Sequence, residues 1–285
     1  MNKWHKVEQN IGYTILTLCA LFVLLFLVVI LFDIGSKGIG SLSISFLVES
    51  PREGMTGGGI FPALMGTIFV TLITIIFSFP IGVAAAIYLN EYAKQTFSTR
   101  LIRASIRNLA GVPSIVYGLF GVALFVQAMG LGRSVLASGL TLGILTLPWI
   151  ITTAEESLKN IPQSFRDGSL ALGATKWETI YLNVLPYAMP GILTGGILGI
   201  SRAAGETAPI LFTGVAFFIP DLPQSLFDQF MALPYHLYIM STQHHAIELV
   251  RPLAYGTALV LILMVFGLNL GAIIIRYRLR KKYRL

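Results

Sequence analysis

The chain has 285 residues, of which 55% are hydrophobic and only 12% are charged. A soluble domain carries about 25% charged residues, so lipid must solvate most of this chain. A disordered tail, a collagen-like chain and a disulfide scaffold are excluded, because apolar residues dominate and Cys19 is the single cysteine. The net charge is +7, and six of the 20 basic residues stand among the last ten, directly after an apolar run. That pattern predicts a cytoplasmic topology anchor and argues against nucleic acid as a partner.

Six apolar stretches are long enough to cross a hydrocarbon core of about 30 Å, which needs roughly 20 residues per helix. In chain order they are 11–32, 60–89, 108–129, 134–153, 187–218 and 253–275. The second and fifth exceed the membrane thickness, so we expect them to tilt, bend or protrude. The expected fold is all-α and polytopic. Residues 1–59 supply the first transmembrane helix and an outer loop, and 60–285 supply a core of five further helices.

The loops predict the orientation of these helices. Loop 95–107 carries three arginines and no acid, whereas loop 33–59 mixes both signs. Since basic loops stay in the cytoplasm, both termini are expected there. The alternation then makes 155–186 a cytoplasmic loop and 219–250 a long outer loop with interrupted amphipathic stretches such as 225–233. The N-terminus lacks a small-residue cleavage site, which favours an uncleaved first helix.

The cytoplasmic loop has the composition of a short surface helix. Residues 164–181 are expected to be helical, with an interruption at Gly173, and a new helix can begin at Leu185-Pro186. One interpretation is an amphipathic helix resting on lipid headgroups. Because its charges are balanced and not basic, a protein partner in the cytoplasm is favoured.

A charged pair interrupts the fifth apolar stretch. Arg202 and Glu206 are the only charges between Glu178 and Asp221, and counting along 187–218 places Arg202 near the bilayer midplane. A central arginine costs about 2.5 to 3.5 kcal/mol even on a lenient insertion scale, so it must face protein, water or a partner charge. At 100° per residue the pair shares one stripe with three glycines, which would let another helix approach closely. The glycines are Gly191, Gly195 and Gly199.

The pair has two interpretations. In the first, Glu206 neutralises Arg202 in a purely structural ion pair. In the second, the planar guanidinium group of Arg202 binds an oxyanion while Glu206 holds it in place. Pro209 cannot donate to the carbonyl of Gly205, so we expect a bend within one turn of the pair. A bent helix with a charged pair is a candidate translocation site, to which Ser201 and Thr207 would add hydroxyl donors.

Several chemistries have no support in the sequence. No P-loop motif occurs, and His244 and His245 lack carboxylates at metal-ligand spacing. No serine, histidine and aspartate gather into a catalytic constellation. We therefore expect a transport subunit that is not an enzyme and carries no cofactor or metal.

Sequence motifs then point to a family. Asp167-Gly168-Ser169, followed by Gly173 and by Leu185-Pro186, resembles the EAA loop of ABC-importer permeases, although Asp replaces Glu and Gly-Ser replaces Ala-Ala. Further motifs resemble permeases for phosphate, and the outer loop with Ala232-Leu233-Pro234 resembles their PstA type. These motifs are Gly58 to Ala63, Pro80 to Ala84, Tyr88 to Glu91, Gly111 to Gly118 and Ser201 to Pro209.

The resemblance implies a type I ABC importer permease with MetI-like architecture in a bacterial or archaeal cell membrane. It implies four kinds of partner: a paralogous permease chain as heterodimer, two cytoplasmic ATPase subunits, an extracytoplasmic phosphate-binding protein, and inorganic phosphate as the cargo. Coupling to the ATPase is assigned to Asp167, Gly168, Ser169, Ala171, Gly173, Ala174, Leu185 and Pro186. A permease for phosphonate, sulfate or molybdate and an ion-gradient-driven anion transporter stay open as alternatives.

Overall fold

Long apolar runs form helices here because a helix satisfies its own backbone hydrogen bonds where no water is available. The computed structural model describes residues 3–282, so Arg284 of the basic tail lies outside the described residues. The helices are α1 (Lys3–Gly38), α2 (Ile44–Val48), α3 (Phe61–Ile87), α4 (Phe97–Leu109), α5 (Ser114–Gly121), α6 (Val135–Lys159), α7 (Gln163–Ala171), α8 (Lys176–Glu178), α9 (Leu185–Gly205), α10 (Ala208–Thr213), α11 (Leu233–Thr242) and α12 (Ile247–Lys282).

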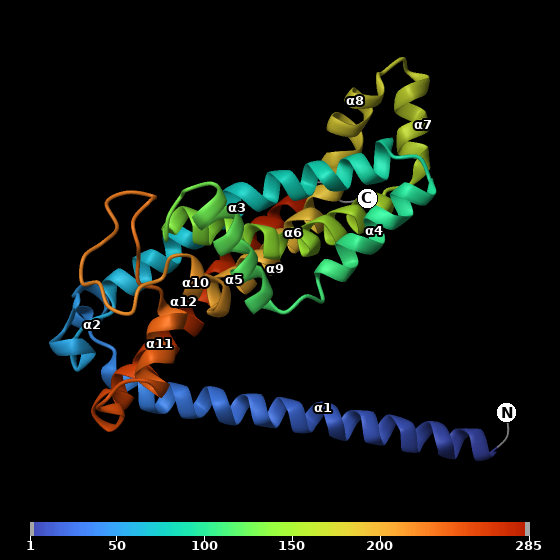
Figure 1. The fold of residues 1–285 in the computed structure, drawn as a ribbon. Helices are drawn as coiled ribbons and strands as arrows, with labels where there is room; N and C mark the ends of the chain where they lie inside the picture. The colour runs from blue at the N-terminus through green and yellow to red at the C-terminus, as the bar shows by residue number, and fades with distance from the viewer. Residues whose placement is uncertain (1–2, 283–285) are drawn as a thin grey trace.

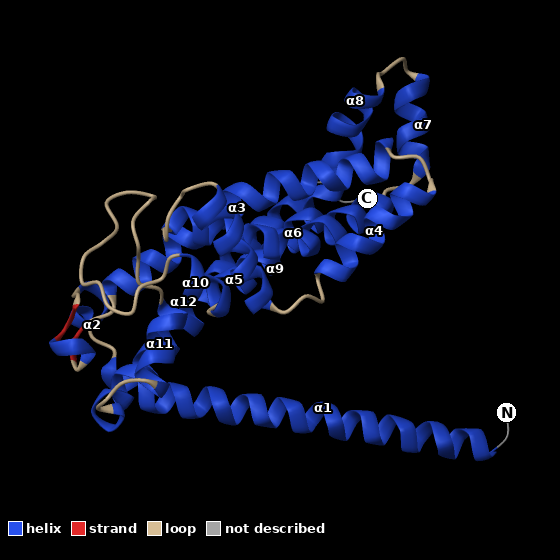
Figure 2. Ribbon diagram, in the orientation of Figure 1, coloured by secondary structure: helices blue, strands red, loops and turns tan. Residues whose placement is uncertain are grey.

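Shorter elements join these helices. Wider π-helical turns are η3 (Tyr88–Tyr92), η4 (Val122–Ala128) and η5 (Thr179–Val184), and 3-10 turns are η1 (Ile39–Ser41) and η2 (Glu53–Met55). Strands β1 (Pro51–Arg52) and β2 (Gly57–Gly58) pair antiparallel, with Pro51 opposite Gly58. Figure 2 shows these strands beside α2, at the end of the molecule away from α7.

Five helical stretches within residues 3–282 are long and apolar enough to span a membrane, and a sixth span results if one bent pair is counted. The stretches are Gln9–Ser41, Phe61–Tyr92, Val135–Lys159, Lys176–Gly205 and Ile247–Leu279, and the bent pair is Phe97–Leu109 with Ser114–Ala128. The expected span over 108–129 corresponds to the second half of this pair, and the loop expected over 95–107 is largely helix α4, which meets that half at 103°. Pro113 explains the bend, since a residue before proline avoids the helical conformation.

The helices are arranged around α6. It packs along α3 on one side and along α9 on another, and α12 lies against α9. Helix α1 stands apart and meets α12 near Gly38, while residues 9–32 are exposed along their whole length (Figure 1). The described chain ends lie at the same end of the bundle as α7 and α8, and α2 and α11 lie at the other (Figure 1). The expected alternation of loops along the chain is thus confirmed.

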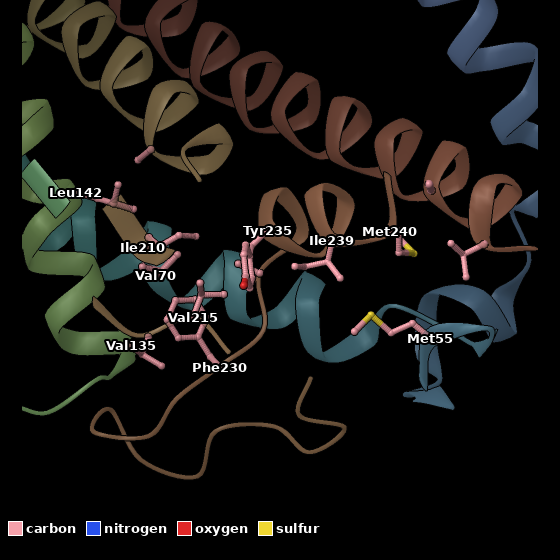
Figure 3. Packing of buried hydrophobic residues seen from close by; sticks show 14 residues of the cluster. Met55, Val70, Val135, Leu142, Ile210, Val215, Phe230, Tyr235, Ile239 and Met240 are labelled. Carbon is pink, nitrogen blue, oxygen red and sulfur yellow. The ribbon is translucent and has the colours of Figure 1, made fainter. Parts of the chain in front are cut away.

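Buried apolar side chains form a cluster at each end of the bundle. At the end near α11, Leu142 of α6, Ile210 of α10, Val70 of α3 and Tyr235 of α11 gather from four helices (Figure 3). At the end near α7, a second cluster joins α3, α6 and α9. Its fully buried members include Ala86, Ala154, Leu158, Val184 and Ile192. The two clusters hold α3, α6 and α9 as one unit.

The outer loop 219–250 contains helix α11. The amphipathic stretch 225–233 is not helical before Leu233, where α11 begins with Pro234 in its first turn, a position that proline favours. Asp228 accepts hydrogen bonds from the backbone N–H groups of Gln224 and Ser225, at 2.9 and 2.8 Å, which holds the chain in a turn in place of a helix. The end of this loop is fixed by a parallel bridge between Val215 and Phe230.

Candidate substrate path and coupling surface

The glycine stripe of α9 lies against another helix, as the periodicity predicts, and the structure shows that this helix is α6. A Cβ atom at Gly195 would stand 2.7 Å from Cβ of Thr153, and one at Gly191 would stand 2.3 Å from Oγ of Ser157. Gly199 is looser, with Ile150 of α6 at 3.4 Å. Because these glycines have no side chains, the side chains of α6 pack directly on the backbone of α9. This contact fixes the direction of the last turns of α9.

The fifth span breaks where the charged pair stands. Helix α9 ends at Gly205, Glu206 is extended at φ −74° and ψ 135°, and α10 begins two residues later with Pro209 in its first turn. The expected bend is confirmed, and the apolar stretch 187–218 is divided between α9 and α10. Arg202 lies in the last turn of α9. Pro209 explains the break between α9 and α10, because a proline starts a helix well and cannot continue one.

Arg202 is held from two sides at this break. Its Nε donates to Oε1 of Glu206 at 3.1 Å, and its Cζ lies 5.5 Å from the ring centre of Trp149 on α6. The side chains of Arg202 and Glu206 are 35% and 16% exposed. Since the bond to Glu206 uses one of the five N–H donors of the guanidinium, the group can still present a planar fork to an oxyanion.

The two predicted hydroxyl donors are placed differently. Thr207 lies half-buried at the break itself, next to Glu206. Ser201 is turned toward α12, where its hydroxyl contacts Oδ1 of Asn269, and it also donates to the carbonyl of Ile197 within α9. The structure therefore brings Arg202 and Glu206 into contact, leaves Thr207 beside Glu206 in the chain, and directs Ser201 to a helix contact. Trp149 was missed from the sequence, since only the packing of α6 against α9 places it beside Arg202.

The cytoplasmic loop contains two helices where one over 164–181 is expected. Helix α7 ends at Ala171, and Gly173 turns the chain at φ +86°, a conformation that glycine adopts without strain. Helix α8 then begins with Thr175 and Glu178 capping each other. It continues through η5 into α9, so Leu185 and Pro186 are half-buried within a continuous helical rod.

The predicted coupling residues divide into an exposed set and a buried one. Asp167, Gly168, Ala171 and Gly173 are exposed and Ala174 is half-buried. Ser169 faces inward, where its hydroxyl accepts hydrogen bonds from Thr179 and Asn183 at 3.0 and 2.9 Å. This contact joins α7 to the rod that leads into α9.

Large apolar side chains accompany the exposed set. Leu172 is 90% exposed and Trp177, stacked on Tyr181, is 58% exposed. Apolar groups gathered on a polar surface typically mark a protein contact.

The comparisons with known proteins agree with this architecture. The family described as "Binding-protein-dependent transport system inner membrane component" matches residues 78–285. This chain belongs to that family. It is accordingly a multi-pass membrane subunit of a transporter and not an enzyme.

Named relatives cover most of the chain. The "Probable ABC transporter permease protein YqgI" of Bacillus subtilis is 31% identical over 94% of both sequences. The "Phosphate transport system permease protein PstA 1" of Mycobacterium tuberculosis is 37% identical over 80% of this chain and 73% of its own. The PstA permease of Yersinia pestis is 35% identical over 78% of this chain and 76% of its own.

Solved structures confirm the predicted fold class. A chain of a bacterial ABC transporter for the polysaccharide alginate superposes with a TM-score of 0.68 at 13% identity, covering 96% of this chain and 98% of that one. A chain of the MetNI methionine ABC transporter in an inward-facing form superposes with a TM-score of 0.62 at 17% identity, covering 76% and 94%. The MetI-like permease fold expected from the sequence is thereby confirmed.

Proposed function

We propose that this protein is the PstA-type permease subunit of an ATP-driven phosphate importer. Relatives named as phosphate permeases at 35% and 37% identity support the cargo. The proposed partners are a paralogous permease chain, two copies of a cytoplasmic ATPase and an extracytoplasmic phosphate-binding protein. In this assembly the chain forms one half of the translocation path, and the ATPase supplies the free energy from ATP.

The observation that carries the proposal is the half-exposed guanidinium at the break between α9 and α10. Arg202 has a fixed orientation between Trp149 and Glu206, and it retains N–H donors for the oxygens of an anion. Glu206 keeps the empty site from being strongly positive. Such a site binds phosphate weakly, and transport requires weak binding because a tightly held ion would not be released.

The coupling surface supplies the second half of the mechanism. The ATPase is proposed to dock on the exposed residues of α7, the turn at Gly173 and α8. When its two copies close on ATP, they move this surface together with the rod η5–α9 that follows it in the chain. Because Arg202 ends that rod, closure of the ATPase dimer reaches the proposed phosphate site through a continuous helix.

Uptake into vesicles tests the proposal. The permease pair is reconstituted with and without the ATPase, the binding protein is added outside, and uptake of labelled phosphate is compared with uptake of sulfate. We expect uptake only with ATPase and ATP, and only of phosphate. Phosphate uptake without the ATPase would contradict the ABC mechanism, and equal uptake of sulfate would contradict the cargo.

A substitution addresses the proposed site directly. Arg202→Gln removes the charge and is expected to abolish phosphate uptake while the complex still assembles. A suitable control is Arg251→Gln, because Arg251 also pairs with a glutamate close by in the sequence, Glu248, at 2.6 Å, but on an exposed surface. Wild-type uptake rates in Arg202→Gln would remove Arg202 from the mechanism.

A further inference from the structure

A buried ion pair lies beneath the coupling surface and joins helices far apart in the sequence. Arg166 of α7 contacts Glu91 of η3, which extends α3, across 75 residues of chain. Its Nη2 lies 2.7 Å from Oε1 and its Nε lies 3.1 Å from Oε2, so each nitrogen meets its own carboxylate oxygen. The side chains are only 12% and 6% exposed. This bidentate geometry fixes direction as well as distance.

The remaining donors of Arg166 bind the end of α6. Its Nη1 donates to the carbonyl of Ile161 at 2.8 Å, and Nη2 also donates to the carbonyl of Leu158 at 3.0 Å. The last carbonyls of a helix lack partners within the helix, and a cation stabilises them. One side chain of α7 therefore holds the ends of both α3 and α6, the two helices that pack along each other in the core.

A hollow leaves space around this pair. It measures about 620 Å³ and is lined by Glu91, Arg166, Lys159, Lys176 and the start of η5. The charged side chains in it are already engaged, since Lys159 contacts Glu155 at 2.8 Å and Lys176 lies over the ring of Tyr92. The hollow thus separates α7 from the body of the bundle, and the pair bridges it.

We propose that Arg166 and Glu91 form a joint that passes motion of the coupling surface to α3 and α6. They are positioning residues, because they touch neither the cargo nor ATP. The joint rests on the proposed docking of an ATPase on α7. The joint gives α7 a second connection to the core, in addition to the continuous helical stretch that leads through η5 into α9. As a result, α6 with Trp149 and α9 with Arg202 move together.

The test measures whether ATP binding reaches the break near Arg202. In the full complex with its ATPase, Cys19 is replaced by serine and Thr207 by cysteine, and the rate of labelling by an impermeant thiol reagent is measured with and without a non-hydrolysable ATP analogue. Glu91→Gln keeps the shape of the side chain and removes its charge. Arg166→Lys keeps the charge and removes the fork.

A matched ion pair serves as the control. Arg103 of α4 and Glu155 of α6 contact at 2.7 Å with 11% and 10% exposure at the same end of the bundle, but neither lies on α7. Its variants are Arg103→Lys and Glu155→Gln. If the joint exists, the ATP analogue changes the labelling rate in the parent and in the control variants, and this response is lost in Glu91→Gln and Arg166→Lys while the ATPase still co-purifies.

Two results would overturn the joint. One is a labelling rate at Thr207→Cys that ignores the analogue in the parent complex, and the other is an equal response in the parent, joint and control variants. Phosphate uptake is measured in separate vesicles whose complex keeps Thr207, because Thr207 belongs to the proposed substrate path, and uptake does not enter this readout. A nucleotide response at Thr207→Cys, together with no phosphate uptake by the complex that keeps Thr207, would contradict the proposed cargo and still support the joint.

Discussion

Replacing Gly195 with alanine is expected to force α9 away from α6. The new Cβ would stand 2.7 Å from Cβ of Thr153, whereas ordinary van der Waals contact begins at 3.4 Å, so the helices must separate by about 0.7 Å. Such overpacking costs about 1 to 3 kcal/mol. Alanine also gains about 1 kcal/mol over glycine in a helix, and that gain must be measured separately.

Gly267→Ala provides this reference, because Gly267 lies in α12 with nothing within 4 Å of a Cβ atom. The two variants therefore differ by the overpacking cost alone, which corresponds to about 2 to 12 °C in Tm at roughly 2 to 4 °C per kcal/mol. The assay is thermal unfolding of the purified permease in nanodiscs. Thr153→Gly removes the side-chain atoms that the new Cβ meets, so combining it with Gly195→Ala should restore most of the loss.

Equal Tm values of Gly195→Ala and Gly267→Ala would contradict the overpacking of α9 against α6. Additive effects of Thr153→Gly and Gly195→Ala would contradict it as well, because additivity would mean that the two positions do not touch.

Two further predictions concern α11 and the turn after α7. His236 is buried, and burial with a smaller contribution from His244 lowers its pKa from 6.5 to about 4. The unfolded chain takes up the proton first as the pH falls. The free energy of unfolding should therefore be constant above pH 6.5 and fall by roughly 3 kcal/mol as the pH drops to about 4. Unfolding midpoints of the wild type and of His236→Gln, measured across that range, test this loss of stability. At Gly173, whose φ is +86°, valine costs about 1 to 2 kcal/mol of strain and should weaken co-purification of the ATPase, whereas unchanged co-purification would argue against docking there.

Local patterns predicted the features that depend on neighbouring residues. Runs of apolar residues predicted the helices, the spacing of Gly191 and Gly195 predicted that another helix packs closely on α9, and Pro209 predicted the bend. Each of these signals acts within a few residues, where periodicity and backbone chemistry decide the outcome. Pro113 carries a signal of the same kind, since a proline disfavours the helical conformation in the residue before it.

Contacts between distant residues left no such pattern. Trp149 lies beside Arg202 because two helices pack at a particular rotation, and Arg166 meets Glu91 across 75 residues of chain. Alone, each of these side chains is an ordinary aromatic or charged residue of a helix. Pro209 predicted a break within one turn of Arg202, but the residue at which α9 ends was not predicted.

The π-helical turns η3 and η5 stand on either side of the hollow beneath α7 and contribute Glu91 and Thr179 to its lining. In a π-helix each N–H bonds the carbonyl five residues back and not four, so such a turn stores one extra residue. Returning a turn to α geometry would rotate the side chains beyond it by about 100° and advance them by about 1.5 Å. Helix α3 thus ends, and helix α9 begins, at a register step that changes which side chains face the hollow, without unfolding the helix or exposing its backbone to lipid.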